Sequence, residues 1–221
     1  SINYYLSLGN DFVQFHQLIQ KKLKLKFLGF HCLNCESDSK IYRQGFCKSC
    51  FFESPQTADW IMRPENSKAH LGIEDRDLEY EKRVQLQPHI VYLANSSNVK
   101  VGVTRKTQVP TRWIDQGAIT ALEILEVPNR YLAGLAEVAL KNYISDKTNW
   151  REMLKGNTSN VNLSDWKSKL KEYIPDELKP YILNTQSQVN INFPVQKHPT
   201  SPKSLNLIKA QEYEGVLSGI K

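Results

Sequence analysis

The sequence predicts a mixed α/β protein, and three observations support this fold class. Between residues 90 and 140, apolar runs typical of strands alternate with segments whose apolar residues have the spacing of a helix. Upstream, four cysteines form two CxxC pairs, and downstream a proline-punctuated tail carries further strand-like runs. Helices interleaved with strands are typical of α/β folds. We therefore expect a small α/β unit, preceded by a metal-binding module and followed by a β-rich tail.

The N-terminal third is expected to contain two segments. Residues 1–30 form a β segment, because residues 23–27 alternate Leu, Lys, Leu, Lys and Phe. This period of two favours a half-exposed strand with a basic outer face. Residues 31–87 hold the cysteines and then a charged connector, which we expect to be partly helical.

The central unit is expected to span residues 88–156 and to begin after Pro88 ends the connector. A turn-forming run, Asn-Ser-Ser-Asn, joins its first two strands, and a helical repeat of apolar residues marks its last helix. The expected elements, in order, are strands at 90–94 and 99–104, a helix from near Arg112, a strand at 122–127 and a helix at 131–145.

The composition changes again over residues 157–221, which we expect to form a helix and a β-rich tail. The helix is expected to begin after an N-cap at Ser164 and to end near Ile174. The runs NINFPV and YEGVLSGI read as strands of a separate subdomain that pairs with residues 1–30. Because the sequence stops within a strand-and-turn pattern, we expect the protein to continue beyond Lys221.

The cysteines are the clearest chemical signal in the chain. Cys32 and Cys35 form one CxxC pair, and Cys47 and Cys50 form a second pair after eleven intervening residues. Two such turns aim four thiolates at one ion, and Gly45 helps the second turn to form. The pattern predicts a structural Zn²⁺ site with a closed tetrahedral sulfur shell. A redox-active pair, or iron in the same shell, are the alternatives.

The surroundings of the cysteines leave two questions open. His31 and His70 are alternative ligands or ordinary histidines. Phe46, Phe51 and Phe52 either stack on bases or fill the core of the module. The module itself either contacts nucleic acid or only holds together a segment with little core of its own.

Charge favours an anionic partner. The net charge is +6 and the isoelectric point is near 9.0. Basic residues cluster at 21–26 and again at Lys100, Arg105, Lys106 and Arg112, a distribution that favours nucleic acid. A protein that is merely basic is the plainer alternative.

The sequence also bears on location. It has no apolar run of about 18 residues and no secretory signal at its start, so we expect no membrane partner. Paired CxxC motifs suit a reducing compartment, which favours the cytoplasm. The sequence indicates no particular protein partner.

Polar residues follow a fixed order between residues 90 and 150. A tyrosine lies in the first strand, a glycine in the second, an arginine on the next helix and a glutamate on the last, with an asparagine twelve residues on. This order resembles the GIY-YIG nuclease superfamily, and the matching residues are Tyr92, Gly102, Arg112, Glu137 and Asn149. The runs TRWIDQGA and DKTNW also resemble a bacterial family of unknown function, which implies no activity.

The GIY-YIG resemblance implies a metal-dependent nuclease. Tyr92 would help to deprotonate water, and Arg112 would stabilise the charge of the phosphorane. Glu137 would bind Mg²⁺ or Mn²⁺ with support from Asn149. Lys100 departs from the pattern, because it stands where the family has its second tyrosine.

Lys100 therefore leaves two interpretations of the central unit open. It either binds phosphate in place of the tyrosine, or it marks a domain that kept the fold without cleavage. The alternative function is a non-catalytic, zinc-stabilised module that binds nucleic acid or another protein.

Each candidate also has an ordinary structural interpretation. Asp115 and Gln116 either add ligands or cap a helix end. The other interpretations are a core aromatic for Tyr92, an exposed helix residue for Arg112, an ion pair with Arg112 or Lys141 for Glu137, and a helix cap for Asn149.

Overall fold

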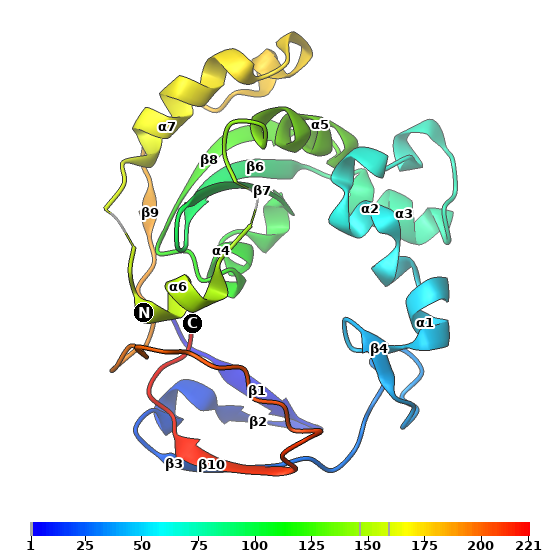
Figure 1. The fold of residues 1–221 in the computed structure, drawn as a ribbon. Helices are drawn as coiled ribbons and strands as arrows, with labels where there is room; N and C mark the ends of the chain where they lie inside the picture. The colour runs from blue at the N-terminus through cyan, green and yellow to red at the C-terminus, as the bar shows by residue number, and fades with distance from the viewer. Residues whose placement is uncertain (1, 146, 159) are drawn as a thin grey trace.

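A computed structural model describes residues 2–145, 147–158 and 160–221, and it confirms a mixed α/β fold with several antiparallel sheets (Figure 1). The central sheet has the strand order β7-β6-β8-β9. Its strands are β6 (His89–Asn95), β7 (Val99–Arg105), β8 (Thr120–Val127) and β9 (Val189–Asn190). The first three contain the strands that the sequence predicts.

Two helices complete the central unit in the expected order. Helix α4 (Thr111–Asp115) connects β7 to β8, and α5 (Arg130–Leu140) follows β8. The helix predicted over 131–145 is shorter than expected. The chain leaves the helix after Leu140, and Ser145 then forms a parallel bridge with Lys100 on the outer edge of β7. Pairing with the sheet edge thus replaces the last helical turn.

The central sheet carries a hydrophobic core on each face, because its side chains alternate between the faces. On one face, residues such as Val91 and Leu93 pack under α5 and α7 (Leu163–Leu170). On the other face, Ile90, Tyr92 and Ala94 pack against Trp113 of α4. The two helices that carry candidate residues, α4 and α5, therefore lie on opposite faces of the sheet.

The cysteine module and connector precede the sheet. The module contains β4 (Ile41–Arg43), β5 (Phe46–Cys47) and α1 (Lys48–Glu53). The connector contains α2 (Asp59–Met62), α3 (Leu78–Gln85) and the 3-10 turns Pro55–Thr57, Pro64–Asn66 and Ala69–Leu71. Figure 1 shows α2 and α3 beside the end of α5, with the module beyond them.

Close backbone packing fixes the connector to α5. A Cβ atom on Gly134 would lie 2.2 Å from the backbone nitrogen of Glu65, so only glycine permits this approach. Arg130 adds two hydrogen bonds, from Nε to the Trp60 carbonyl at 3.1 Å and from Nη2 to the Ile61 carbonyl at 2.7 Å. The connector is thus part of the same packed body as the sheet.

The two ends of the chain form small sheets at the side opposite α5 and α7 (Figure 1). Strand β1 (Tyr5–Leu8) pairs with β2 (Asp11–Gln14), followed by the 3-10 turn Phe15–Leu18. Strand β3 (Lys22–Lys26) pairs with β10 (Glu212–Val216), as the sequence suggested. Strand β9, in contrast, joins the central sheet beside β8.

The remaining elements lie between β8 and the tail. They are α6 (Trp150–Lys155), α7 and the 3-10 turns Lys171–Tyr173 and Asp176–Tyr181. The predicted N-cap at Ser164 is wrong, because Asn162 caps α7 by accepting a hydrogen bond from the Ser164 N–H. Among the helices of the described residues, none has the length and apolarity to cross a membrane.

Candidate functional site

Tyr92 lies across β7 because Gly102 leaves room for it. The two residues are opposite one another in the β6–β7 ladder, and Tyr92 is fully buried. A Cβ atom on Gly102 would lie 2.7 Å from the Tyr92 hydroxyl oxygen. The hydroxyl donates a hydrogen bond of 2.7 Å to Oε1 of Gln116, at the end of α4. The glycine therefore lets a buried tyrosine reach the helix that carries Arg112.

Charges from both faces of the sheet act on this hydroxyl. Burial raises the pKa of Tyr92 to about 12. The charge of Arg112 and a side-chain hydrogen bond with it lower the pKa, whereas the charge of Glu137 raises it. Arg112 is exposed and Glu137 is half-buried. The Tyr92 hydroxyl is thus where the influences of α4 and α5 meet, and it stays protonated at neutral pH.

A hollow of about 240 Å³ adjoins this position through Arg112. Three guanidinium groups line it, from Arg105 on β7, Arg112 on α4 and Arg130 on α5, and Asp115 is the one carboxylate among the described lining residues. Three positive charges and one negative charge give these residues a formal net charge of +2. Such a surface attracts an anion.

The pKa of Arg130 is affected by the other charges of the hollow. Burial lowers the pKa of Arg130 to about 10, and the charges of Arg105 and Arg112 act in the same direction. Glu137 opposes them by raising the pKa. The sequence interpretation missed Arg130, because nothing in its local pattern shows that α5 begins beside the strand carrying Arg105.

Lys100 lies diagonally from Tyr92 on the β6–β7 ladder, because its direct partner is Ala94. Its side chain is buried, and Nζ donates a 2.6 Å hydrogen bond to Oγ1 of Thr148. Thr148 also contacts the hydroxyl of Ser96 at 3.1 Å. Lys100 therefore ties the segment after α5 to the sheet.

Asn149 is the N-cap of α6, the structural role that its sequence context allows. Its Oδ1 accepts hydrogen bonds from the N–H groups of Arg151 at 3.2 Å and Glu152 at 3.4 Å, which caps α6. Its own N–H donates to Oγ of Ser97 in the β6–β7 turn. Since Arg105 pairs with His89 at the other end of this ladder, Asn149 and the arginine hollow lie toward opposite ends of the hairpin.

The four cysteines form a compact second site. Their sulfur atoms all lie within 4.8 Å of one another, and those of Cys35 and Cys47 are 3.9 Å apart. A tetrahedral zinc ion with bonds of about 2.3 Å separates its sulfurs by about 3.8 Å. The cluster therefore has the dimensions to hold a metal such as zinc.

Backbone turns place these thiols. Gln44 and Gly45 both have positive φ, 52° and 85°, in the two-residue turn between β4 and β5. Positive φ at both positions is typical of a type I′ hairpin. The tight turn presents Cys47 at the end of β5, where its N–H donates to the Cys32 sulfur at 3.3 Å.

Hydrogen bonding makes the thiols unequal. Backbone N–H groups of Cys35 and Cys47 lower the pKa of Cys32 to about 6. The Asn34 amide lowers the pKa of Cys50, but burial and the other thiols outweigh it and raise the value to about 12. A thiolate at Cys32 suits a cation, since metals bind the deprotonated form.

The residues near the cysteines have mainly structural roles. Phe46 is buried and Phe51 packs against the cluster, whereas Phe52 is 55% exposed. His70 stacks on Tyr131 with ring centroids 4.5 Å apart. Among the described residues, the four cysteines are therefore the group with the geometry to hold a metal.

The basic run at 21–26 is not an isolated positive patch. In the β3–β10 sheet, Lys22 lies 2.9 Å from Glu214, while Lys24 and Lys26 lie 3.2 and 3.7 Å from Glu212. These exposed pairs contribute little stability. They do offset the charge of the strand, so the arginine hollow is the stronger candidate for anion binding.

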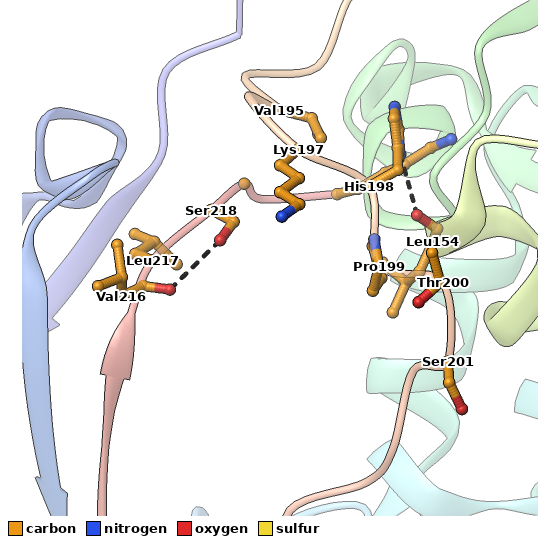
Figure 2. A pocket seen from close by; sticks show the side chains of 12 residues that line it. Leu154, Val195, Lys197, His198, Pro199, Thr200, Ser201, Val216, Leu217 and Ser218 are labelled. Carbon is orange, nitrogen blue, oxygen red and sulfur yellow. Dashed lines mark hydrogen bonds between the residues drawn. The ribbon is translucent and has the colours of Figure 1, made fainter.

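Another hollow, of about 630 Å³, lies between tail segments 195–201 and 216–221. Figure 2 shows the side chains that line it. His198 points toward α6, where Nδ1 contacts the Leu154 carbonyl at 2.9 Å. Lys197 also lines the hollow, and no carboxylate side chain is found among the described lining residues. We assign it no chemistry, because none of the candidate residues lines it.

The fold and these sites define a mixed α/β protein with a four-cysteine cluster that can hold a metal. The chain belongs to the family described as "Protein of unknown function (DUF2797)", whose model matches residues 20–221. No curated protein and no solved structure matches the chain. The family description assigns no activity, so the nuclease interpretation stays a prediction.

Proposed function

We propose that the edge of β7 is an active site for metal-dependent cleavage of phosphodiester bonds in nucleic acid. Support comes chiefly from one observation, the joint action of Arg112 and Glu137 on the buried Tyr92 hydroxyl beside a hollow lined by three arginines. The GIY-YIG resemblance gives the same three residues their roles. Of the other two matching residues, Gly102 makes room for Tyr92, whereas Asn149 caps α6 toward the other end of the hairpin.

In this proposal the ionised form of Tyr92 accepts a proton from the attacking water. A bond forms between the water oxygen and phosphorus, the bond from phosphorus to one sugar oxygen breaks, and that oxygen takes up a proton from solvent water. Because the pKa of Tyr92 is about 12, its ionised form is a minor species at neutral pH. Arg112 increases the ionised fraction by lowering the pKa of Tyr92. Its guanidinium also stabilises the negative charge that develops on the phosphoryl oxygens.

Glu137 is the proposed ligand for Mg²⁺ or Mn²⁺. Magnesium sites often combine one or two carboxylates with several waters and substrate phosphate oxygens, so a single glutamate fits this chemistry. When bound, the ion supplies positive charge at the reacting phosphate. The chain's own contribution is to hold Glu137 on α5, where its charge already acts on Tyr92 and Arg130.

The cysteine cluster is the proposed site of structural Zn²⁺. Four sulfur ligands close the coordination shell, so this ion takes no part in cleavage. Its role is to hold the module that leads into α2 and α3. Reduced thiols of this kind accord with the proposed cytoplasmic location.

The test is cleavage of labelled single-stranded, duplex and branched DNA and RNA, with Mg²⁺ or Mn²⁺. Wild-type protein should cleave at least one form, and Glu137→Ala should abolish cleavage while leaving binding largely intact. Glu172→Ala, which removes a carboxylate from the 3-10 turn after α7, is the matched control. Equal cleavage by Glu137→Ala and the wild type would exclude the proposed metal ligand.

The second candidate is a non-catalytic nucleic-acid-binding or protein-interaction module. It is favoured by Lys100, which replaces a tyrosine of the pattern and donates to Thr148. Binding without cleavage of any substrate would support the nucleic-acid version of this candidate. Absence of binding at low salt would leave only the protein-interaction version, because phosphate contacts weaken as salt rises.

A further inference from the structure

We propose that the arginine hollow is a subsite for one nucleotide, with a cationic wall for phosphate and an apolar wall for an unpaired base. This inference deepens the proposed function, on which it rests, by naming a single-stranded or locally unpaired segment as the ligand. The apolar wall comes from the connector, which lies outside the predicted central unit.

The cationic wall is built from three different elements. Arg105 extends from β7, Arg112 from α4 and Arg130 from α5. Arg130 is anchored by its two hydrogen bonds to the connector backbone, and the charges of the other two act on it. Arg105 and Arg112 can bind phosphate through paired N–H donors. Arg130 mainly adds its positive charge, because its Nε and Nη2 already donate to the connector. A phosphate would therefore relieve the repulsion among three like charges.

The connector contributes apolar and aromatic side chains to the lining of the same hollow. Ile61 of α2 and Tyr80 and Val84 of α3 line the hollow. Tyr80 and Val84 are four residues apart on one helix, so they present a continuous strip. A hollow that combines an aromatic and aliphatic strip with arginines is complementary to a nucleotide, which carries a flat base beside its phosphate.

The size of the hollow limits what can enter. Its volume, about 240 Å³, is below the roughly 300 Å³ at the lower end of small-molecule pockets. It therefore has space for one nucleotide at most. A base that enters must leave its stack, which costs least in a single strand.

The apolar wall is fixed before any ligand binds. Gly134 lets the backbone at Glu65 approach α5, and Arg130 bonds to the carbonyls of Trp60 and Ile61. The same residue thus holds the connector and contributes to the cationic wall. Preorganisation of this kind reduces the cost of binding.

The experiment is isothermal titration with thymidine 5′-monophosphate and, separately, inorganic phosphate, using zinc-loaded full-length protein without added Mg²⁺ or Mn²⁺. The nucleotide should bind at least about fivefold more tightly than phosphate, because the base adds contacts. Arg105→Gln should weaken both ligands at least about fivefold. Lys106→Gln is its control, because this neighbouring lysine pairs with Glu126 outside the hollow.

The aromatic wall is tested by Tyr80→Leu, with Tyr181→Leu as the matched control from the 3-10 turn near α7. Tyr80→Leu should weaken the nucleotide at least about threefold and leave phosphate unchanged. Ile61→Ala tests the same wall if Tyr80→Leu fails to fold, as judged by thermal melting. Equal affinity for nucleotide and phosphate in the wild type, or no binding of either, would overturn the subsite.

The outcomes separate this inference from the nuclease proposal. Nucleotide binding that depends on Arg105 and Tyr80, in a protein that cleaves nothing, keeps the subsite and rejects the nuclease. Cleavage that depends on Glu137, without selective nucleotide binding, rejects the subsite alone.

Discussion

Replacing Gly102 by alanine should disrupt the packing of Tyr92. The added Cβ would lie 2.7 Å from the tyrosine hydroxyl oxygen and 2.8 Å from Cζ. Ordinary contacts begin near about 3.4 Å, so the ring would have to move by roughly 0.7 Å. Tyr92 is fully buried and bonded to Gln116, which leaves it little room to do so.

The expected cost combines two effects. Overpacking a well-filled core typically costs about 1–3 kcal/mol. Weakening the hydrogen bond between Tyr92 and Gln116 adds up to about 1 kcal/mol. We therefore expect Gly102→Ala to lower the free energy of unfolding by about 1–4 kcal/mol.

Urea unfolding followed by circular dichroism measures this change. Gly29→Ala is the control, because a Cβ there meets no atom within 4 Å, and it should change stability by less than about 0.5 kcal/mol. If Gly102→Ala were as stable as Gly29→Ala, the tyrosine would not lie across β7 as described. The role of Tyr92 in the site would then lose its structural basis.

Three further predictions follow from the titrating groups and the thiols. Burial lowers the pKa of His89 to about 4, from an ordinary value of 6.5, so the unfolded chain takes up this proton more readily than the folded protein. Stability should therefore fall as the pH drops from about 6.5 to about 4, by up to roughly 3 kcal/mol, and His89→Asn should reduce that slope in urea titrations. Cleavage, if Tyr92 acts as the base, should become faster as the pH rises from 7 to 9, approaching about tenfold per pH unit in single-turnover assays, and a flat profile would argue against this role. Cys47→Ser should reduce bound zinc well below one equivalent by elemental analysis and destabilise the cysteine module, whereas unchanged zinc content would count against the four-sulfur site.

Local sequence patterns predicted most of the central unit. The apolar run at 90–94, the turn-forming residues after it and the apolar residues at 99–104 predicted the paired strands, which the β6–β7 ladder confirms. The two CxxC motifs likewise identified the compact cysteine cluster, because the ligands are close in sequence. Short-range periodicity is sufficient for features of this kind.

Long-range contacts were harder to foresee. The approach of Gly134 to Glu65 joins distant segments through backbone packing, and no local pattern marks it. The pairing of the basic strand with the C-terminal strand was expected, but the ion pair between Lys24 and Glu212, which offsets the positive charge of that strand, was not. Arg130 became part of the candidate site only through the placement of α5. These features depend on tertiary packing, which local sequence patterns do not reveal.

The most direct test of the proposed active site is to locate a divalent ion in crystals. Crystals of the zinc-loaded protein soaked in Mn²⁺ should show an anomalous peak, at the manganese edge, within about 2.2 Å of a Glu137 carboxylate oxygen. Crystals of Glu137→Ala treated in the same way should lack it. A wild-type structure with no peak at Glu137 under these conditions would contradict the proposed catalytic metal site.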